Sequence, residues 1–316
     1  MSSNSISLVT KFVDKLDEEF KYGSFTSILD TPAELVNFSG ANAVEYPKIS
    51  LDGLADVDLD GDIVAGGVTL TWETKTMSNH RARAFKVHRS DNEETLGASF
   101  GYVASQFLKQ KVVPEADAYR IAKMATAAIG NSESAEATLA ADTTEAALKA
   151  GILSMKENEA WSEGNMVCFM TPTVKSYLEA DTGTKMAIVQ PAGDGVYSDL
   201  IYNYNGLKII EVPQGRMYTV IDQYDGSGDG ETAGGYVKDA TGTDINFLIV
   251  NPESVIQVKK FEIPRFFAPS KEDMARYGAE GVWPNGNQWK FDYEHYHDLF
   301  VYDNKVDGLY CHHKAT

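Results

Sequence analysis

The chain has 316 residues, and its 28 Lys and Arg against 46 Asp and Glu give a formal net charge of −18. A surface this acidic argues that the protein does not bind nucleic-acid phosphate backbones or anionic lipid directly. Two cysteines, Cys168 and Cys311, argue against a disulfide framework, and the lack of a long apolar run and of a basic leader argues against a membrane span and a secretory signal.

Residues 1–43 combine a short amphipathic helix, predicted over 8–20, with a segment whose apolar residues are irregularly spaced. Pro32 and Gly40 interrupt that segment, which is typical of an arm that lies across another surface. A disordered or docked terminus explains the same pattern equally well.

Residues 44–89 alternate apolar and polar side chains over 44–51, 68–76 and 83–89, which predicts three strands with polar turns between them. Residues 51–62 hold five Asp and no base, whereas residues 75–89 hold five bases and no acid. We expect Arg81, Arg83, Lys86 and Arg89 to contact acidic surface on another copy of the chain, because opposite charges steer association. The alternative is a solvated hairpin whose two arms neutralise each other.

Residues 90–128 give the longest helical pattern in the chain. Ser90 and Glu93 have the spacing of a capping box at its start. Apolar residues then recur at three- and four-residue steps and predict a buried face, formed by Leu96, Phe100, Val103 and Phe107. Pro114 predicts a stop or bend before a second helical run. A long helix between β-rich segments indicates an α+β fold with a helical spine, although an ordinary core helix has the same periodicity.

The second half of the chain mixes shorter helices and strands. Helices are predicted from Asp142 and from Pro172, and strands over 166–170, 207–213 and 217–222. A Gly- and Asp-rich loop at 225–235 follows. Long β patterns return from 245 to 267 and near the end of the sequence, over 298–313.

Two groups of residues raise the question of a metal site. Asp56, Asp58, Asp60 and Gly61 match the first half of an EF-hand calcium loop, but Gly67 stands where a bidentate Glu belongs and strands flank the run. A polar turn is the favoured interpretation, and the second acidic loop is a weaker match. Zinc-ligand types occur at spacings that fit no known finger. The members of these two weaker groups are Asp225, Asp229 and Glu231, and His295, His297, Asp298, Cys311, His312 and His313.

The sequence holds no phosphate-binding glycine loop, nucleophile elbow or paired-His metalloprotease motif. Scattered Ser, His and Asp residues support no catalytic triad. We therefore expect no catalytic residues, no resident metal and no cofactor, and we predict that the protein is not an enzyme.

Several segments, taken together in chain order, resemble a known family. They are FSGANAVEYPKISLDGLADVD, GGVTLTWETKT, RARAFKVHRSDNEET, VVPEADAYRIAKMA, CFMTPTVKSYLE and DNKVDGLYCHH. In these segments the chain resembles a major capsid protein of a tailed bacteriophage with the Hong Kong 97 type of fold. The resemblance implies an N-terminal arm at 1–43, an extended β-loop at 44–89, a peripheral domain with a spine helix at 90–140, an axial domain at 141–244 and a return to the peripheral domain at 245–316.

The same resemblance implies self-assembly into hexamers and pentamers of an icosahedral shell around double-stranded DNA, without sequence-specific binding, membrane or catalysis. The location would be the virion, after assembly in the host cytoplasm. Portal, scaffolding and decoration proteins are candidate partners, and the sequence leaves the presence of the last two open. In some relatives Lys and Asn join covalently, but no motif here identifies such a pair. Two alternatives stay open: an encapsulin-type bacterial compartment shell, which shares the fold, and a calcium-dependent β-rich binding module.

Overall fold

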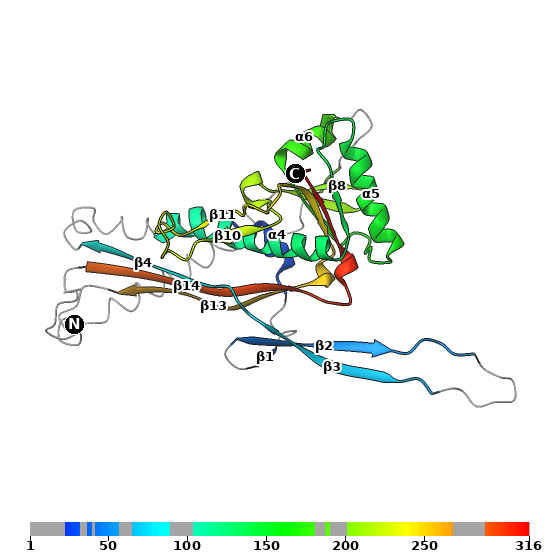
Figure 1. Ribbon diagram of the computed structural model, residues 1–316, viewed down its shortest axis with the longest axis horizontal. Coiled ribbons are helices and arrows are strands. Elements are labelled where there is room, and N and C mark those ends of the chain that lie inside the picture. The colour runs from blue at the N-terminus through cyan, green and yellow to red at the C-terminus, as the bar shows by residue number, and fades with distance from the viewer. Residues whose placement is uncertain are drawn as a thin grey trace.

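The computed structural model describes residues 23–31, 37–39, 42–56, 65–88, 104–180, 187–189, 201–267 and 288–315. Within these residues the fold mixes α and β elements, as the sequence predicted. Figure 1 shows an elongated subunit, with a layered helical and β body at one side and a β-hairpin projecting from it.

A seven-stranded sheet with the strand order β5-β15-β12-β6-β9-β8-β7 forms the centre of the body. Its central strands read as continuous apolar runs, such as MVCFM in β6, because helices cover both faces. The turn between β8 and β9 is Asn205-Gly206, both at positive φ, which is the two-residue hairpin signal. The strands are β5 (Ser134–Glu136), β6 (Met166–Met170), β7 (Ala187–Val189), β8 (Ile201–Tyr204), β9 (Leu207–Glu211), β12 (Ile245–Val250) and β15 (Leu309–His313).

Three helices sandwich this sheet. Helix α4 (Val113–Gly130) buries Ile121 and Met124 against one face of the sheet, in the core cluster that includes Cys311. On the other face, α5 (Thr144–Glu157) and α6 (Pro172–Ala180) pack over the cluster that includes Cys168. Both cysteines are free and buried, and burial raises the pKa of each thiol. That of Cys311 is raised to about 12.

The helix that leads into α4 does not stop at Pro114. Leu108–Val112 form a π-helical segment, in which the Val113 N–H donates to the Leu108 carbonyl five residues back. Proline has no N–H to donate, and the wider turn carries the backbone past it without a break. Helical structure is therefore continuous from Ala104 to Gly130 in the described chain.

A second sheet lies against α4, on the side away from the seven-stranded sheet (Figure 1). Its order is β13-β14-β4, all antiparallel, with β13 (Val255–Phe267), β14 (Gln288–Val301) and β4 (His80–His88). Phe85, Phe107 and Phe291 meet edge to face or stacked between this sheet and the helix. Such aromatic contacts add to the free energy gained by burial.

The projecting hairpin consists of β2 (Ala43–Leu51) and β3 (Val68–Thr76), with the short β1 (Asn37–Ser39) on the outer edge of β2. The expected three strands at 44–89 all form, but they do not share one sheet. The third, β4, pairs with β14 rather than with β3. Its pairing partners lie two hundred or more residues away along the chain, so the local alternation of side chains gives no information about them.

The remaining elements are short. β10 (Ile221–Gln223) and β11 (Tyr236–Lys238) form a ribbon that carries the loop 224–235. In the described ranges the 3-10 helices are η1 (Phe25–Leu29), η4 (Gln214–Arg216), η5 (Pro252–Ser254) and η7 (Val306–Gly308). No helix in the described ranges is both long and apolar enough to cross a membrane.

A buried carboxylate fixes η1 to α4. Asp117, fully buried, accepts hydrogen bonds from the Ser24 and Thr26 hydroxyls at 2.6 and 2.8 Å and from the Phe25 and Thr26 N–H groups. Arg216 donates to it at 2.9 Å. Buried Arg120 donates to the Thr26 hydroxyl, also at 2.9 Å. These hydrogen bonds attach residues 24–26 to α4.

Candidate assembly surfaces

The hairpin β2–β3 carries an exposed apolar face. Directly opposite residues share a face of a β-ribbon, and so does every second residue along a strand. The register pairs Pro47 with Trp72, Ile49 with Leu70 and Leu51 with Val68, which places all six on one face. Each is exposed, and Leu51 and Val68 retain 67% and 72% of their accessible surface.

The opposite face of the hairpin is used within the subunit. Val44 and Tyr46 point to this face near its base and are buried in a cluster with Ile256 and Val258 of β13. Tyr46 also meets the Tyr302 ring edge to face, with centroids 4.9 Å apart. Farther out, the same face carries Lys48, Ser50, Thr69 and Thr71. The hairpin is thus anchored by one face at its base and presents apolar side chains to solvent on the other.

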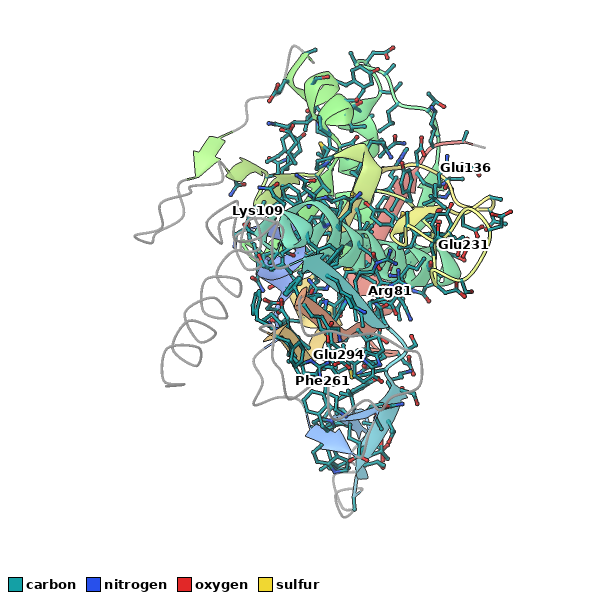
Figure 2. All side chains as sticks on the ribbon, turned by 90° about the vertical axis from the view of Figure 1, so that its left-hand side faces the viewer. Arg81, Lys109, Glu136, Glu231, Phe261 and Glu294 are labelled. Atoms are coloured by element: carbon teal, nitrogen blue, oxygen red, sulfur yellow. The ribbon has the colours of Figure 1, made fainter. Side chains whose placement is uncertain are left out.

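The basic residues of β4 divide between two faces. Arg81 and Arg83 point toward the helix layer, where Arg81 Nε donates to Glu115 at 2.7 Å and Arg83 donates to the Thr232 carbonyl at 3.0 Å. Alternation places Lys86 on the opposite face. In Figure 2, Arg81 lies on the side of the sheet nearer Glu231, away from Phe261 and Glu294. Arg89 lies outside the described residues.

A cavity of about 630 Å³ lies between β4, the helix segment 106–116 and the loop 224–235. Phe85 and Phe107 form part of its apolar wall, and buried Tyr293 lies among the residues from β14. Arg81, Arg83 and Lys111 also line it, together with Glu115 and Asp225. Sequence reasoning did not find this cavity, because it joins segments far apart along the chain.

The predicted core residues of the spine fall mostly outside the described part of the chain. Leu96, Phe100 and Val103 belong to residues 89–103, whose structure is not described. Phe107 is half-buried and contacts Phe85 with ring centroids 4.7 Å apart and Tyr293 at 6.0 Å.

The candidate zinc ligands form a buried polar cluster of a different kind. The His295 and His297 rings stack 4.0 Å apart beneath α4, and His297 Nε2 lies 2.9 Å from the Asn79 amide. Burial, and then nearby positive charge, lowers the pKa of both imidazoles well below its ordinary value. Asp298 accepts from the Ser78 N–H at 2.8 Å and from Tyr119 at 2.9 Å. These residues join β14 to the helix.

The other metal candidates give no assembled site in the described ranges, where no group of three or more His, Cys, Asp and Glu could hold a metal ion. Asp56 is exposed, whereas Asp58, Asp60 and Gly61 lie outside those ranges. Asp225 accepts from the hydroxyl and N–H of Ser227, and these bonds lower its pKa. Asp229 is exposed and Glu231 half-buried on the same loop. Cys311 and His312 are neighbours on β15, in the sheet that α4 covers.

No protein-family model matches the sequence, and no curated protein matches it. Solved structures do match. A structure from Gordonia phage Cozz has a TM-score of 0.58 at 13% identity, and the match covers 93% of this chain and 87% of that one. A chain from the asymmetric unit of the bacteriophage PhiM1 mature capsid has a TM-score of 0.55 at 13% identity, and the match covers 87% of this chain and 82% of that one. A Mycobacterium phage Ogopogo structure has a TM-score of 0.52 at 11% identity, and the match covers 94% of this chain and 91% of that one. The chain has a phage-capsid fold.

Beyond its base, the hairpin leaves six apolar side chains exposed, which packing within the subunit does not explain. The apolar face was within reach of sequence reasoning, since VTLTWETKT and YPKISL alternate. It becomes recognisable only when the register shows that the apolar positions of both strands coincide.

Proposed function

We propose that this protein is the major capsid protein of a tailed bacteriophage. Copies would assemble into hexamers and pentamers of an icosahedral shell that encloses double-stranded DNA without reading its sequence. The role is structural and requires no catalytic group. The peripheral and axial domains would correspond to the two sides of α4, with the hairpin as the extended loop.

The observation that carries this proposal is the exposed apolar face of β2–β3. Removing apolar surface from water stabilises by about 25 cal/mol per Å². Six neighbouring apolar side chains left in solvent therefore favour association. The hairpin's other face packs on its own subunit only at its base and is polar farther out, so the apolar face would be buried by contact with another copy.

We propose a supporting role in assembly for the basic strand. Arg81, Arg83, Lys86 and Arg89 would contact acidic surface on neighbouring subunits, in addition to the ion pair that Arg81 forms with Glu115 in its own chain. The sign of the net charge supports acidic protein surface, rather than DNA, as the partner of these residues.

Electron microscopy of purified protein tests the assembly, and a shortened hairpin tests its cause. Residues 49–70 are replaced by Asn-Gly, which joins the register partners Lys48 and Thr71 through a two-residue turn. Buried Val44, Tyr46 and Met77 remain in place. We expect closed particles from the parent, and from the variant a folded subunit that forms none. Closed particles from the variant would contradict the proposed role of the hairpin.

The contents of native particles test the rest of the function. Nuclease-protected double-stranded DNA is expected inside particles from infected or induced cells. Particles that contain a protein cargo and no DNA would instead favour the encapsulin-type compartment. A monomer whose melting temperature rises with calcium, and which forms no particles, would favour the binding-module alternative.

A further inference from the structure

The cavity between β4, the helix segment 106–116 and the loop 224–235 has an aromatic and apolar wall. The Phe85 and Phe107 rings meet edge to face in this wall with centroids 4.7 Å apart, and Val112 extends it along the helix. Tyr293 is almost fully buried among the lining residues. At about 630 Å³ the cavity lies within the size range of pockets that hold small organic molecules. Neither the fold comparison nor the hairpin's role assigns it a ligand.

Charge at the cavity is opposite in sign to that of the whole chain. Three bases, Arg81, Arg83 and Lys111, line it against two acids, Glu115 and Asp225, on a protein of net charge −18. Arg81 pairs with Glu115 at 2.7 Å, so the charges of these two residues offset each other. Arg83 donates to a neutral backbone carbonyl, and both Arg83 and Lys111 are exposed. These two cations are therefore able to bind an anionic group of a ligand at the exposed edge of the cavity.

A buried donor at the cavity has no acceptor in the described chain. His297 lines the cavity and keeps only 2% of its accessible surface. Its Nε2 lies 2.9 Å from the Asn79 amide nitrogen, which can only donate, so the hydrogen of the neutral imidazole belongs to Nδ1. Nδ1 has no hydrogen-bond partner among the described residues. An unsatisfied buried N–H costs free energy, and a ligand that carries an acceptor atom would remove that cost.

Together these features specify the chemistry of a ligand. Two phenylalanine rings favour a flat aromatic body, because aromatic rings pack against each other in stacked and edge-to-face arrangements. Arg83 and Lys111 favour an anionic group, and the imidazole N–H of His297 favours an acceptor atom. We propose that the cavity binds a small aromatic anion that carries a hydrogen-bond acceptor. This site is independent of the proposed shell function, which uses the apolar face of β2–β3.

Two probes that differ by one charged group test the site. The first, 1-anilinonaphthalene-8-sulfonate, carries a sulfonate on an aromatic body, and the second, N-phenyl-1-naphthylamine, is the same body without the sulfonate. Fluorescence titration of the unassembled chain measures the dissociation constant of each probe. We expect the sulfonate to bind at least about fivefold more tightly, because only the sulfonate pairs with Arg83 and Lys111. Equal affinity of the two probes would contradict the proposal.

Removing the two cations tests whether the cavity selects the anion. Arg83→Gln combined with Lys111→Gln should abolish the preference for the sulfonate. Lys86→Gln combined with Lys109→Gln is the matched control, because it removes two positive charges from the same strand and helix at positions that do not line the cavity. The control should keep the preference. An equal effect of the two pairs would show that net charge alone selects the anion, and the proposal would fail.

Filling the cavity tests where the probes bind. Ala233→Trp places a large side chain on the loop where it lines the cavity, whereas Ala84→Trp places it on β4 outside the lining. Both positions are exposed, so the subunit should stay folded. We expect the first substitution to abolish saturable binding of both probes and the second to leave it unchanged. Unchanged binding to the Ala233→Trp chain would place the probes elsewhere and overturn the site, while particle formation by the parent would still support the shell function.

Discussion

Asp117 is a residue whose removal should strongly destabilise the subunit. It is fully buried and serves as the acceptor for two hydroxyls, two N–H groups and Arg216. From the sequence it is one acidic residue in a helical run. Its role depends on residues 24–26 and 216, and no local pattern connects these to position 117.

Asp117→Ala should destabilise the free subunit by about 3–5 kcal/mol, because it leaves buried donors and a guanidinium without their acceptor. Urea unfolding of unassembled protein measures the change. Asp222→Asn, at an exposed position of β10, is the control and should stay within about 0.5 kcal/mol. A change at Asp117 as small as that of the control would show that the cluster does not contribute to stability.

The stacked His295 and His297 make stability depend on pH. Burial and the positive charge of Arg120 and Lys259 lower both pKa values. Glu262, opposite His295 in the register, already pairs with Lys259 at 3.0 Å. A histidine whose folded pKa lies below its unfolded value of about 6.5 takes up its proton more readily in the unfolded chain. Stability should therefore be complete above pH 6.5 and fall below it, by up to about 1.4 kcal/mol per pH unit for each histidine.

Comparing urea unfolding at pH 7.5 and pH 5 checks this dependence in the parent and in the double variant His295→Gln/His297→Gln. We expect the double variant to lose less stability on acidification. His312, whose pKa burial lowers to about 4, should keep a smaller dependence in both proteins. Equal losses in parent and variant would assign the dependence to other groups.

At the scale of elements, local patterns predicted most strands and helices but not how they pair. The alternation in 68–76 and the apolar run at 166–170 correctly predicted β3 and β6, because each depends only on neighbours in the chain. The partners of β4 depend on a segment beyond residue 288, so its place beside β14 could not be predicted. Pro114 was expected to stop or bend the helix, and the π turn before it keeps the helix continuous.

The hairpin gives the prediction at this scale. Ile49→Ser with Leu70→Ser changes one cross-strand pair on the exposed face, so subunit stability should change by less than about 0.5 kcal/mol. In the shell, burying such a side chain is worth about 1.5–3 kcal/mol. The protein concentration needed for assembly should therefore rise at least about tenfold. Light scattering over a concentration series measures it.

Ser50→Ala with Thr69→Ala, a pair on the opposite face, is the matched control for that substitution. It changes the same two strands one position away and leaves the apolar face intact. Equal assembly by the Ile49/Leu70 variant and the control would mean that the apolar face stays in solvent in the particle.

For the whole molecule, net charge and the position of the bases decide what the free subunit binds. At −18 it should repel duplex DNA over most of its surface, and the shell needs to confine a genome rather than grip it. Fluorescence anisotropy with a labelled duplex should give a dissociation constant weaker than about 10⁻⁴ M near physiological salt. Arg83→Glu should leave that value unchanged. Tight binding that the substitution abolishes would assign the basic strand to DNA instead.

The order of strands in the seven-stranded sheet also bears on how the subunit is made in the cell. β15 lies between β5 and β12, and it pairs in parallel with residues 134–136, about 175 positions earlier in the chain. A ribosome must therefore synthesise residue 313 before this sheet can be completed, and closing so long a loop slows folding. During synthesis the hairpin emerges long before the core is finished. If the hairpin acts in assembly as proposed, nascent chains carry its apolar face while the rest of each subunit is incomplete, and we expect association to wait until each subunit is whole.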